Sequence, residues 1–418
     1  MEMFNEMFKI GNNKLYCENV ELKYIAEKYG TPAYVYSKNY LIKKYSELHN
    51  ALSPVEHEIF FAVKANGNLS VLKTFADLGC GFDVVSGGEL FRALQAGANS
   101  KRIVFSGVGK SEQEIKFALE QKILCFNVES EAEIMRINEI AKKLSVVAMI
   151  CLRVNPDVDA GTHENITTGT KEKKFGMDIN TILNINMRKY THTIVMGIHF
   201  HIGSQITELS HFKNALSVMK EFWKELKRCG HNLTVFNVGG GLGVKYDNED
   251  VPGLKEYAKM LVDEVKELNM QLYVEPGRSL CGNAGALITR VEYIKNTPYK
   301  NFAIIDAAMN DLMRPALYKA YHKIIPIENH SVNAKIYDVV GPICESSDVM
   351  AYNRELPEIR QGDLLAVMGA GAYAASMSSN YNARLTIPEI MIDGYKDKLI
   401  KPRMSLEKLI EDEKLCMS

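Results

Sequence analysis

The amino-acid sequence predicts an α/β protein with a (β/α)8 barrel and a second, mostly β domain. In the first part of the chain, short β-branched or aromatic runs alternate with amphipathic helical patterns from about residue 58. There are eight such runs, the number that a closed barrel needs. After about Ala286, strand-like runs follow one another with few long helical patterns between them, which indicates the β domain. An open, doubly wound sheet is the alternative for the first part.

The barrel elements follow from local signals in chain order. Ser130 precedes a helical run at 131–144 and can cap it. Gly230 follows the run at 209–229, in the place that glycine prefers after a helix, and Pro252 stands at a predicted helix start. The eight predicted strands occupy 58–64, 82–85, 102–105, 123–128, 147–154, 194–201, 233–238 and 271–275.

The predicted β domain has strand-like runs at 286–296, 302–306, 323–328, 334–340, 364–368 and 385–392. Two further runs, 14–20 and 33–36, precede the barrel and are expected to join the sheet of this domain. We therefore expect a cofactor-binding barrel at 37–282 and a β domain made of 1–36 and 283–418.

Composition excludes several classes of protein. The 418 residues include 50 Lys and Arg against 51 Asp and Glu, a formal net charge of −1. So neutral a chain has no overall field to hold nucleic acid or an anionic membrane, and neither is expected as a partner. With 46% hydrophobic residues the chain can bury a large core, which excludes a disordered protein.

The eight cysteines are dispersed, with no Cys-x-x-Cys pair. A disulfide scaffold or a structural zinc site needs density or paired spacing, so no metal site is expected. The first residues lack the basic and apolar regions of a signal peptide, and the longest weakly polar stretch, 364–377, is too short to span a bilayer. These features predict a soluble, cytoplasmic protein.

Polar residues stand at the ends of the predicted strands, where the catalytic residues of a barrel lie. Lys64 ends the first strand and is either a side chain whose amine reaches solvent or a nucleophile that forms a Schiff base. Asp83 ends the second strand. His199 and His201 lie two residues apart near the end of the sixth and are expected to point to the same side.

Glycine-rich and charged segments follow the last two strands. The run at 239–243 (GGGLG) matches neither a Walker A loop nor a Rossmann loop, but its backbone N–H groups can approach an anion closely. Glu275, Gly277 and Arg278 follow the eighth strand, beside the usual phosphate site of such barrels. Together these residues predict a phosphate-bearing cofactor with a cationic ring atom for Glu275 to pair.

Six motifs occur in order, at 61–66 (FAVKAN), 199–205 (HFHIGSQ), 239–243 (GGGLG), 275–279 (EPGRS), 344–348 (CESSD) and 371–373 (GAY). With these motifs the chain resembles, over about 31–389, the fold-type III pyridoxal-phosphate enzymes, which share the architecture of alanine racemase. Among them it is most similar to the diaminopimelate decarboxylase family. The resemblance implies pyridoxal 5'-phosphate as the cofactor and decarboxylation of meso-2,6-diaminopimelate to L-lysine and CO2, the last step of lysine biosynthesis.

The resemblance also assigns residues to the cofactor. Lys64 would form the Schiff base, Asp83 would lie near it, and His201 would stack on the ring. Glu275 would keep the ring nitrogen protonated, which makes the ring an electron sink. The phosphate would be bound by Ser204, Gly240, Gly277, Arg278 and Tyr373.

Substrate residues follow from the same resemblance. The distal end of the substrate would be bound by Arg278, Arg314, Tyr318, Glu345 and Tyr373. An arginine suits the distal carboxylate because its donors form a planar fork, and Glu345 would accept from the distal ammonium. Cys344 would protonate the α-carbon and so join Lys64 and His201 as a catalytic residue. In this family Cys344 and Glu345 reach into the partner's active site, which implies a homodimer with shared sites.

Four other functions are weighed against this one. A sister decarboxylase for ornithine or arginine needs acids, and no arginine, at the distal end of its pocket. An alanine racemase needs a tyrosine base on the opposite face, and a non-catalytic cofactor carrier lacks the appended β domain. A phosphate-binding isomerase barrel is the alternative based on fold alone. The polar segment 165–174 is either a flap over the site or an ordinary solvated loop.

Overall fold

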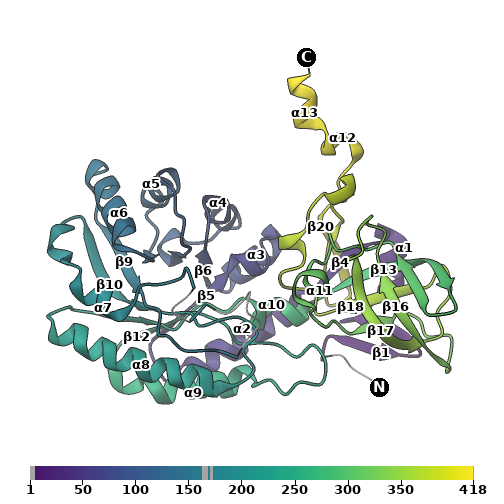
Figure 1. The fold of residues 1–418 in the computed structure, drawn as a ribbon, viewed down its shortest axis with the longest axis horizontal. Helices are drawn as coiled ribbons and strands as arrows, with labels where there is room; N and C mark the ends of the chain where they lie inside the picture. The colour runs from purple at the N-terminus through teal and green to yellow at the C-terminus, as the bar shows by residue number, and fades with distance from the viewer. Residues whose placement is uncertain (1–4, 162–167, 170–172, 418) are drawn as a thin grey trace. The chain divides into compact units, whose positions relative to one another are not determined.

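A computed structural model describes residues 5–161, 168–169 and 173–417 (Figure 1). Most of the segment 165–174, expected to be either a flap or a solvated loop, lies outside the described residues. The chain divides into two compact units. We call one the barrel unit, formed by Ile42–Val244 and Asp250–Leu280, and the other the β unit, formed by Met1–Leu41, Lys245–Glu249 and Cys281–Ser418.

The barrel unit contains eight parallel strands in a closed barrel. The last strand pairs with the first, with Leu272 beside His57 and Val274 beside Ile59, and this pairing closes the ring. All eight predicted strands are present and the barrel is confirmed, so the open sheet is excluded. The strands are β5 (His57–Ala62), β6 (Gly81–Val84), β7 (Ile103–Phe105), β8 (Cys125–Val128), β9 (Ala148–Arg153), β10 (Thr193–His199), β11 (Val235–Asn237) and β12 (Gln271–Val274).

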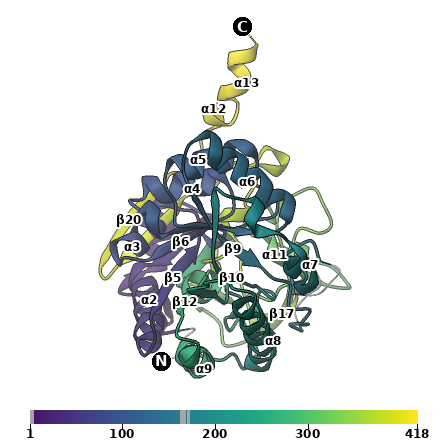
Figure 2. The ribbon, with the colours of Figure 1, turned by 90° about the vertical axis from the view of Figure 1, so that its left-hand side faces the viewer.

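Helices surround this barrel (Figure 2). The Ser130 side chain accepts a hydrogen bond from the Glu133 backbone N–H at 3.2 Å and caps α6, as the sequence predicts. Ser111 caps α5 in the same way, with Glu114 completing a capping box. The helices are α2 (Lys38–Leu52), α3 (Leu69–Asp77), α4 (Gly87–Gln95), α5 (Glu112–Glu120), α6 (Glu131–Lys143), α7 (Ile179–Asn184), α8 (Leu209–Arg228), α9 (Leu254–Val265) and α10 (Arg278–Cys281).

Several predicted boundaries in the barrel unit are wrong by a few residues, for example at the end of β10, which is His199 and not His201, and two others concern Lys64 and Pro252. β5 ends at Ala62, and Lys64 lies in a following 3-10 turn, Val63–Ala65, rather than in the strand. Pro252 precedes the N-cap residue Gly253 of α9 and is not itself in the first turn. Inside the barrel, the strands pack an apolar cluster of Phe60, Val104, Cys125, Cys151, Val235 and Tyr273.

The β unit is built on a nine-stranded sheet in which β4 lies between β13 and β19. The predicted run at 33–36 therefore joins this sheet. The run at 14–20 does not, because its residues pair within a separate three-stranded sheet. The strands of the large sheet are β4 (Ala33–Ser37), β13 (Gly285–Asn296), β14 (Asn301–Ile305), β15 (Ile324–Pro326), β16 (Ala334–Val340), β17 (Val349–Pro357), β18 (Leu364–Met368), β19 (Glu389–Asp393) and β20 (Lys396–Lys401).

The small sheet and the helices complete the β unit. Its apolar core includes Phe8 and Leu15 from the small sheet and Ile288 and Ile390 from the large one. The remaining elements are β1 (Phe8–Gly11), β2 (Lys14–Cys17), β3 (Val20–Glu21), α1 (Leu22–Tyr29), α11 (Arg314–Tyr318), α12 (Leu406–Leu409) and α13 (Glu411–Cys416). None of the helices in the described part of the chain is both long and apolar enough to cross a membrane.

Candidate active site

Lys64 and Asp83 form an ion pair at the carboxyl end of the barrel strands. Lys64 Nζ lies 2.8 Å from Asp83 Oδ2, and the Ser106 hydroxyl donates to Asp83 Oδ1 at 2.6 Å. The Asp83 carboxyl is fully buried, whereas the Lys64 side chain is 36% exposed. Burial raises the pKa of Asp83, and the Lys64 ammonium opposes that rise. The pair therefore holds an accessible amine in a fixed place.

Glu275 follows β12 and lies in a buried polar network. Asn127 and Asn237 donate to its Oε1 at 2.9 and 2.7 Å, and His199 Nε2 lies 3.1 Å from its Oε2. Burial alone would raise the pKa of Glu275, but His199, Lys64 and the Asn237 amide together hold it well below its ordinary value. Glu275 is therefore a buried carboxylate that stays ionised, an arrangement that suits pairing with a cationic ligand atom.

His201 lies two residues beyond the end of β10 and contacts the glycine-rich loop. The Gly240 backbone N–H donates to His201 Nδ1 at 3.1 Å. Burial, and then the charges of Lys64 and Arg153, lower the pKa of His201 well below its ordinary value, so the imidazole is neutral and can accept this bond. A Cβ on Gly240 would lie 2.2 Å from the Glu275 carbonyl oxygen, which explains the glycine.

Ser204 and Arg278, predicted to bind the phosphate, come together. Arg278 Nη2 donates to Ser204 Oγ at 3.1 Å, which joins the loop after β10 to the segment after β12. Gly277 immediately precedes α10, and its carbonyl accepts the Leu280 N–H. A hydroxyl and a guanidinium in hydrogen-bond contact, beside backbone N–H groups, can bind an anion.

Three polar residues of the Glu275 network had no assigned role at the sequence level. Asn127 and Asn237 each interrupt an apolar strand, and His199 was noted but not assigned. Asn127 and Asn237 are fully buried. The sequence did contain a signal for these two residues, because a buried amide inside an apolar strand needs a hydrogen-bond partner. Sequence alone did not identify that partner as Glu275.

A second buried ion pair, between Arg153 and Glu129, was not anticipated at all. Arg153 donates to Glu129 and lies 4.8 Å over the ring of Phe175, and the Gly176 N–H donates to Glu129 at 2.6 Å. Glu129 follows β8 and Arg153 is the last residue of β9, so their positions at strand ends could have singled them out.

The other five predicted site residues lie in the β unit. Arg314 and Tyr318 lie on α11, and Arg314 Nη1 is 2.8 Å from His322 Nε2. His322 Nδ1 lies 2.8 Å from the Met368 carbonyl, which makes Nδ1 the donor and Nε2 the acceptor of the Arg314 proton. The Arg314 guanidinium also lies 4.4 Å over the ring of Tyr246. Arg314 is thus held in a fixed orientation.

Cys344 and Glu345 lie on the loop before β17. Cys344 is an exposed thiol whose backbone N–H donates to Asn382 Oδ1 at 2.9 Å. Ser347 and Tyr381 donate to Glu345 and lower its pKa. Tyr373, in the turn after β18, has a left-handed backbone with φ of +54°. Among the described residues, no group of three or more His, Cys, Asp and Glu is arranged to hold a metal ion.

The barrel fold and a site that can bind an anion and pair with a cationic ligand atom define a class of cofactor-binding barrel proteins. Comparison with known proteins agrees with this class. The family model "Pyridoxal-dependent decarboxylase, pyridoxal binding domain" matches residues 38–282. The chain is 47% identical to the diaminopimelate decarboxylase of Vibrio cholerae, over 95% of this chain and 96% of that one. It is 42% identical to that of Aquifex aeolicus, over 98% of both chains.

Solved structures agree as well. Diaminopimelate decarboxylase from Helicobacter pylori complexed with L-lysine superposes with a TM-score of 0.91 at 40% identity, over 94% of this chain and all of that one. The enzyme from M. jannaschii in co-complex with L-lysine superposes with a TM-score of 0.93 at 37% identity, over 99% and 98%. The chain therefore belongs to the diaminopimelate decarboxylase family of pyridoxal-dependent enzymes.

Proposed function

We propose that this protein decarboxylates meso-2,6-diaminopimelate to L-lysine and CO2, the last step of lysine biosynthesis, with pyridoxal 5'-phosphate as cofactor. The observation that supports this most is a buried, ionised Glu275 at the same barrel end as an accessible lysine amine. The relatives are named diaminopimelate decarboxylase, which supports diaminopimelate as the substrate. Two of the related structures contain L-lysine, the product of this reaction.

The barrel residues fit the cofactor chemically. Among the described residues, Glu275 Oε1 has two amide donors and Oε2 has the His199 contact alone, so Oε2 has acceptor capacity for a protonated ring nitrogen. Arg278 and Ser204 supply donors for a phosphate. Bound pyridoxal phosphate supplies an electron sink for the electron pair that CO2 loss leaves behind.

Each barrel residue has a distinct role in this proposal. Lys64 is the amine that binds the cofactor, and Asp83 orients it. The neutral His201 lies against the ring. The phosphate is bound by Ser204, Gly240, Gly277, Arg278 and Tyr373. For Gly240 this requires that its N–H leave His201, to which it donates here, or be shared with it.

The remaining roles concern the substrate. Arg278, Arg314, Tyr318 and Tyr373 bind the distal end of the substrate, and Arg314 is aligned by His322. Glu345, whose lowered pKa keeps it ionised, accepts from the distal ammonium. Cys344 delivers a proton to the α-carbon after CO2 leaves. Its exposure on the β unit supports the expectation that Cys344 and Glu345 serve the active site of a second subunit.

The protein is accordingly proposed to be a cytoplasmic homodimer with shared active sites. The domain boundaries proposed from the sequence are 37–282 for the cofactor-binding barrel and 1–36 with 283–418 for the β domain. The matched family region, 38–282, supports this division, and so do the two compact units except at Lys245–Glu249, which belongs to the β unit.

The test is CO2 release by the cofactor-loaded protein, with meso-diaminopimelate, ornithine, arginine and lysine assayed side by side. Release from diaminopimelate alone is the expected result. Release mainly from ornithine or arginine would support the proposed decarboxylation but would refute diaminopimelate as the substrate. No release from any substrate, with the cofactor visibly bound, would overturn the proposed activity.

A further inference from the structure

The chain ends in a helical segment, residues 405–417, that we call the C-terminal arm. It contains α12 and α13 and begins at Ser405, whose side chain caps α12. The segment projects away from the sheet of the β unit (Figure 1). The chain just before the arm is fixed to that unit, because Met404 N–H donates to the Thr386 carbonyl and Arg403 donates to the Thr31 and Pro32 carbonyls.

The arm exposes apolar side chains that a partner would bury. Leu406 is 66% exposed, Ile410 41% and Leu415 74%. Helices as short as α12 and α13 are marginal in water unless an apolar face packs against something. The arm is also acidic, with Glu407, Glu411, Asp412 and Glu413 against Lys408 and Lys414. An acidic helical segment with exposed apolar side chains fits an apolar groove with a cationic edge.

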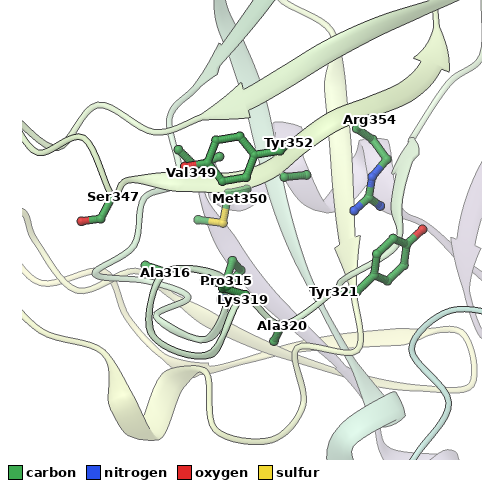
Figure 3. A pocket seen from close by; sticks show the side chains of 11 residues that line it. Pro315, Ala316, Lys319, Ala320, Tyr321, Ser347, Val349, Met350, Tyr352 and Arg354 are labelled. Atoms are coloured by element: carbon green, nitrogen blue, oxygen red, sulfur yellow. The ribbon is translucent and has the colours of Figure 1, made fainter. Parts of the chain in front are cut away.

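The β unit contains such a groove, between α11 and β17 (Figure 3). Its volume is about 330 Å³. Its described lining residues include Lys319 and Arg354 and no acidic side chain, although Asp247 accepts a hydrogen bond from Tyr321 nearby. Arg354 is partly engaged, since it stacks 4.0 Å over Tyr321 and donates to the His322 carbonyl. The lining residues are Pro315, Ala316, Lys319, Ala320, Tyr321, Ser347, Val349, Met350, Ala351, Tyr352 and Arg354.

Both surfaces are exposed in the part of the chain that the structure describes. In the groove, the side chain of Tyr321 is 38% exposed and that of Tyr352 is 63% exposed, so both are accessible, like the apolar side chains of the arm. We propose that the C-terminal arm of one subunit docks in the α11–β17 groove of a second copy of this chain, with Leu406 and Ile410 in the groove and the acidic residues of the arm facing Lys319. The proposal rests on the homodimer proposed above and names a contact that holds it.

Two features favour a second copy as the occupant. A two-fold dimer makes the exchange reciprocal, so that both arms and both grooves are used and no surface remains open for further growth. The groove also includes Ser347, which donates to Glu345 on the loop proposed to enter the partner's active site. Arm docking would therefore occur beside the loop that the shared site needs.

The experiment is sedimentation velocity of the cofactor-loaded full-length protein over a range of concentrations. The arm variant carries Leu406→Asp and Ile410→Asp, and the groove variant carries Lys319→Glu and Tyr352→Asp. We expect each to raise the dimer dissociation constant at least about tenfold, the usual cost of losing one good contact. Combining the four changes in one chain should add little, because both variants lose the same contact. Val332→Asp, at a fully exposed loop position of the β unit, is the matched control.

A one-to-one mixture of the two variants identifies the contact as one between chains. The heterodimer retains one intact arm and one intact groove that meet, so the mixture should associate more tightly than either variant alone. An unchanged dissociation constant in either variant, or a mixture no tighter than its components, would overturn the arm contact and leave the homodimer standing. A wild-type protein that stays monomeric would overturn both, while the CO2 assay tests the activity independently.

Discussion

Replacing Asn237 with Asp tests whether amide donors keep Glu275 ionised. The substitution keeps the size of the side chain and the acceptor for the Gly239 N–H, which Asn237 Oδ1 binds at 2.9 Å. It replaces the amide that donates to Glu275 Oε1 at 2.7 Å with a second carboxyl group. Two carboxyl groups at this short distance in a buried site cannot both be ionised, so the pair must retain a proton.

The size of the effect follows from two contributions. The variant loses or weakens the hydrogen bond from residue 237 to the charged Glu275 carboxylate, and such a bond is worth about 1.5–3 kcal/mol. If the pKa of the pair's proton rises by about three units, its retention costs a further ~4 kcal/mol near neutral pH, at 1.36 kcal/mol per unit. We expect a loss of unfolding free energy of about 3 kcal/mol at pH 5, where the proton contributes about 1.4 kcal/mol, and of about 6 kcal/mol at pH 8, a large part of the total stability of a typical domain.

The pH dependence has opposite signs in the two proteins. In the wild type the pKa of Glu275 is below its unfolded value, so its contribution is present above about pH 4.5 and is lost as the pH falls. In the variant the folded pair binds a proton that the unfolded chain has released above about pH 4. The stability of the variant relative to wild type therefore falls as the pH rises from about 4 toward the raised pKa.

Chemical denaturation followed by circular dichroism at pH 5 and pH 8 measures both quantities, and an absorbance titration with pyridoxal phosphate measures the cofactor affinity. The affinity should fall together with the stability. Asn333→Asp, at an exposed loop position, is the control and should change neither. Equal stability of variant and wild type at both pH values, with equal affinity, would refute the role assigned to the amides around Glu275.

Three further predictions can be checked with single variants. Lys64→Ala should abolish turnover and the absorbance band of lysine-bound cofactor, and near-normal activity would place the amine elsewhere. Cys344→Ala should lower kcat by about 100-fold or more, as expected for a lost proton donor, with a much smaller change in KM; if KM changes more than kcat, the thiol has a packing role. Burial raises the pKa of Glu89 to about 7, so Glu89→Gln should stabilise the protein by about 2 kcal/mol at pH 8 and by much less at pH 4.5, in denaturation curves. Equal stabilisation at both pH values would contradict this.

Most of the fold was predictable because its strands are buried. Parallel barrel strands are apolar on both faces, so all eight appear as short hydrophobic runs. The predicted runs missed three strands of the β unit, β1, β17 and β20, and the last two differ in character from the barrel strands. β20, with sequence KDKLIK, is a charged strand at the edge of the sheet, and charge at an edge prevents further pairing while hiding the strand from a hydrophobic pattern. β17 begins immediately after the polar CESSD run and alternates irregularly in burial.

The candidate site was predictable in part, for a related reason. The ends of barrel strands must converge, so Lys64, Asp83 and Glu275 could be grouped from their positions alone. Hydrogen-bond partners could not be predicted in this way, because they depend on which side chains face each other across the barrel. Asn127 and Asn237 reach the same carboxylate oxygen from strands more than 100 residues apart in the chain, and no local pattern contains that information.

The choice of partners around Glu275 is itself informative. A buried carboxylate is expensive unless it is paired, and the commonest pairing is with Lys or Arg. Here the hydrogen-bond contacts of Glu275 are two neutral amides and a histidine. The two amides add hydrogen bonds to the ionised carboxylate without adding a charge of their own, and they act beside His199 and Lys64, which lower the pKa of Glu275 more than the Asn237 amide does. The network therefore maintains a negative charge in the barrel for a cationic ligand atom, and this explains why polar amides interrupt two otherwise apolar strands.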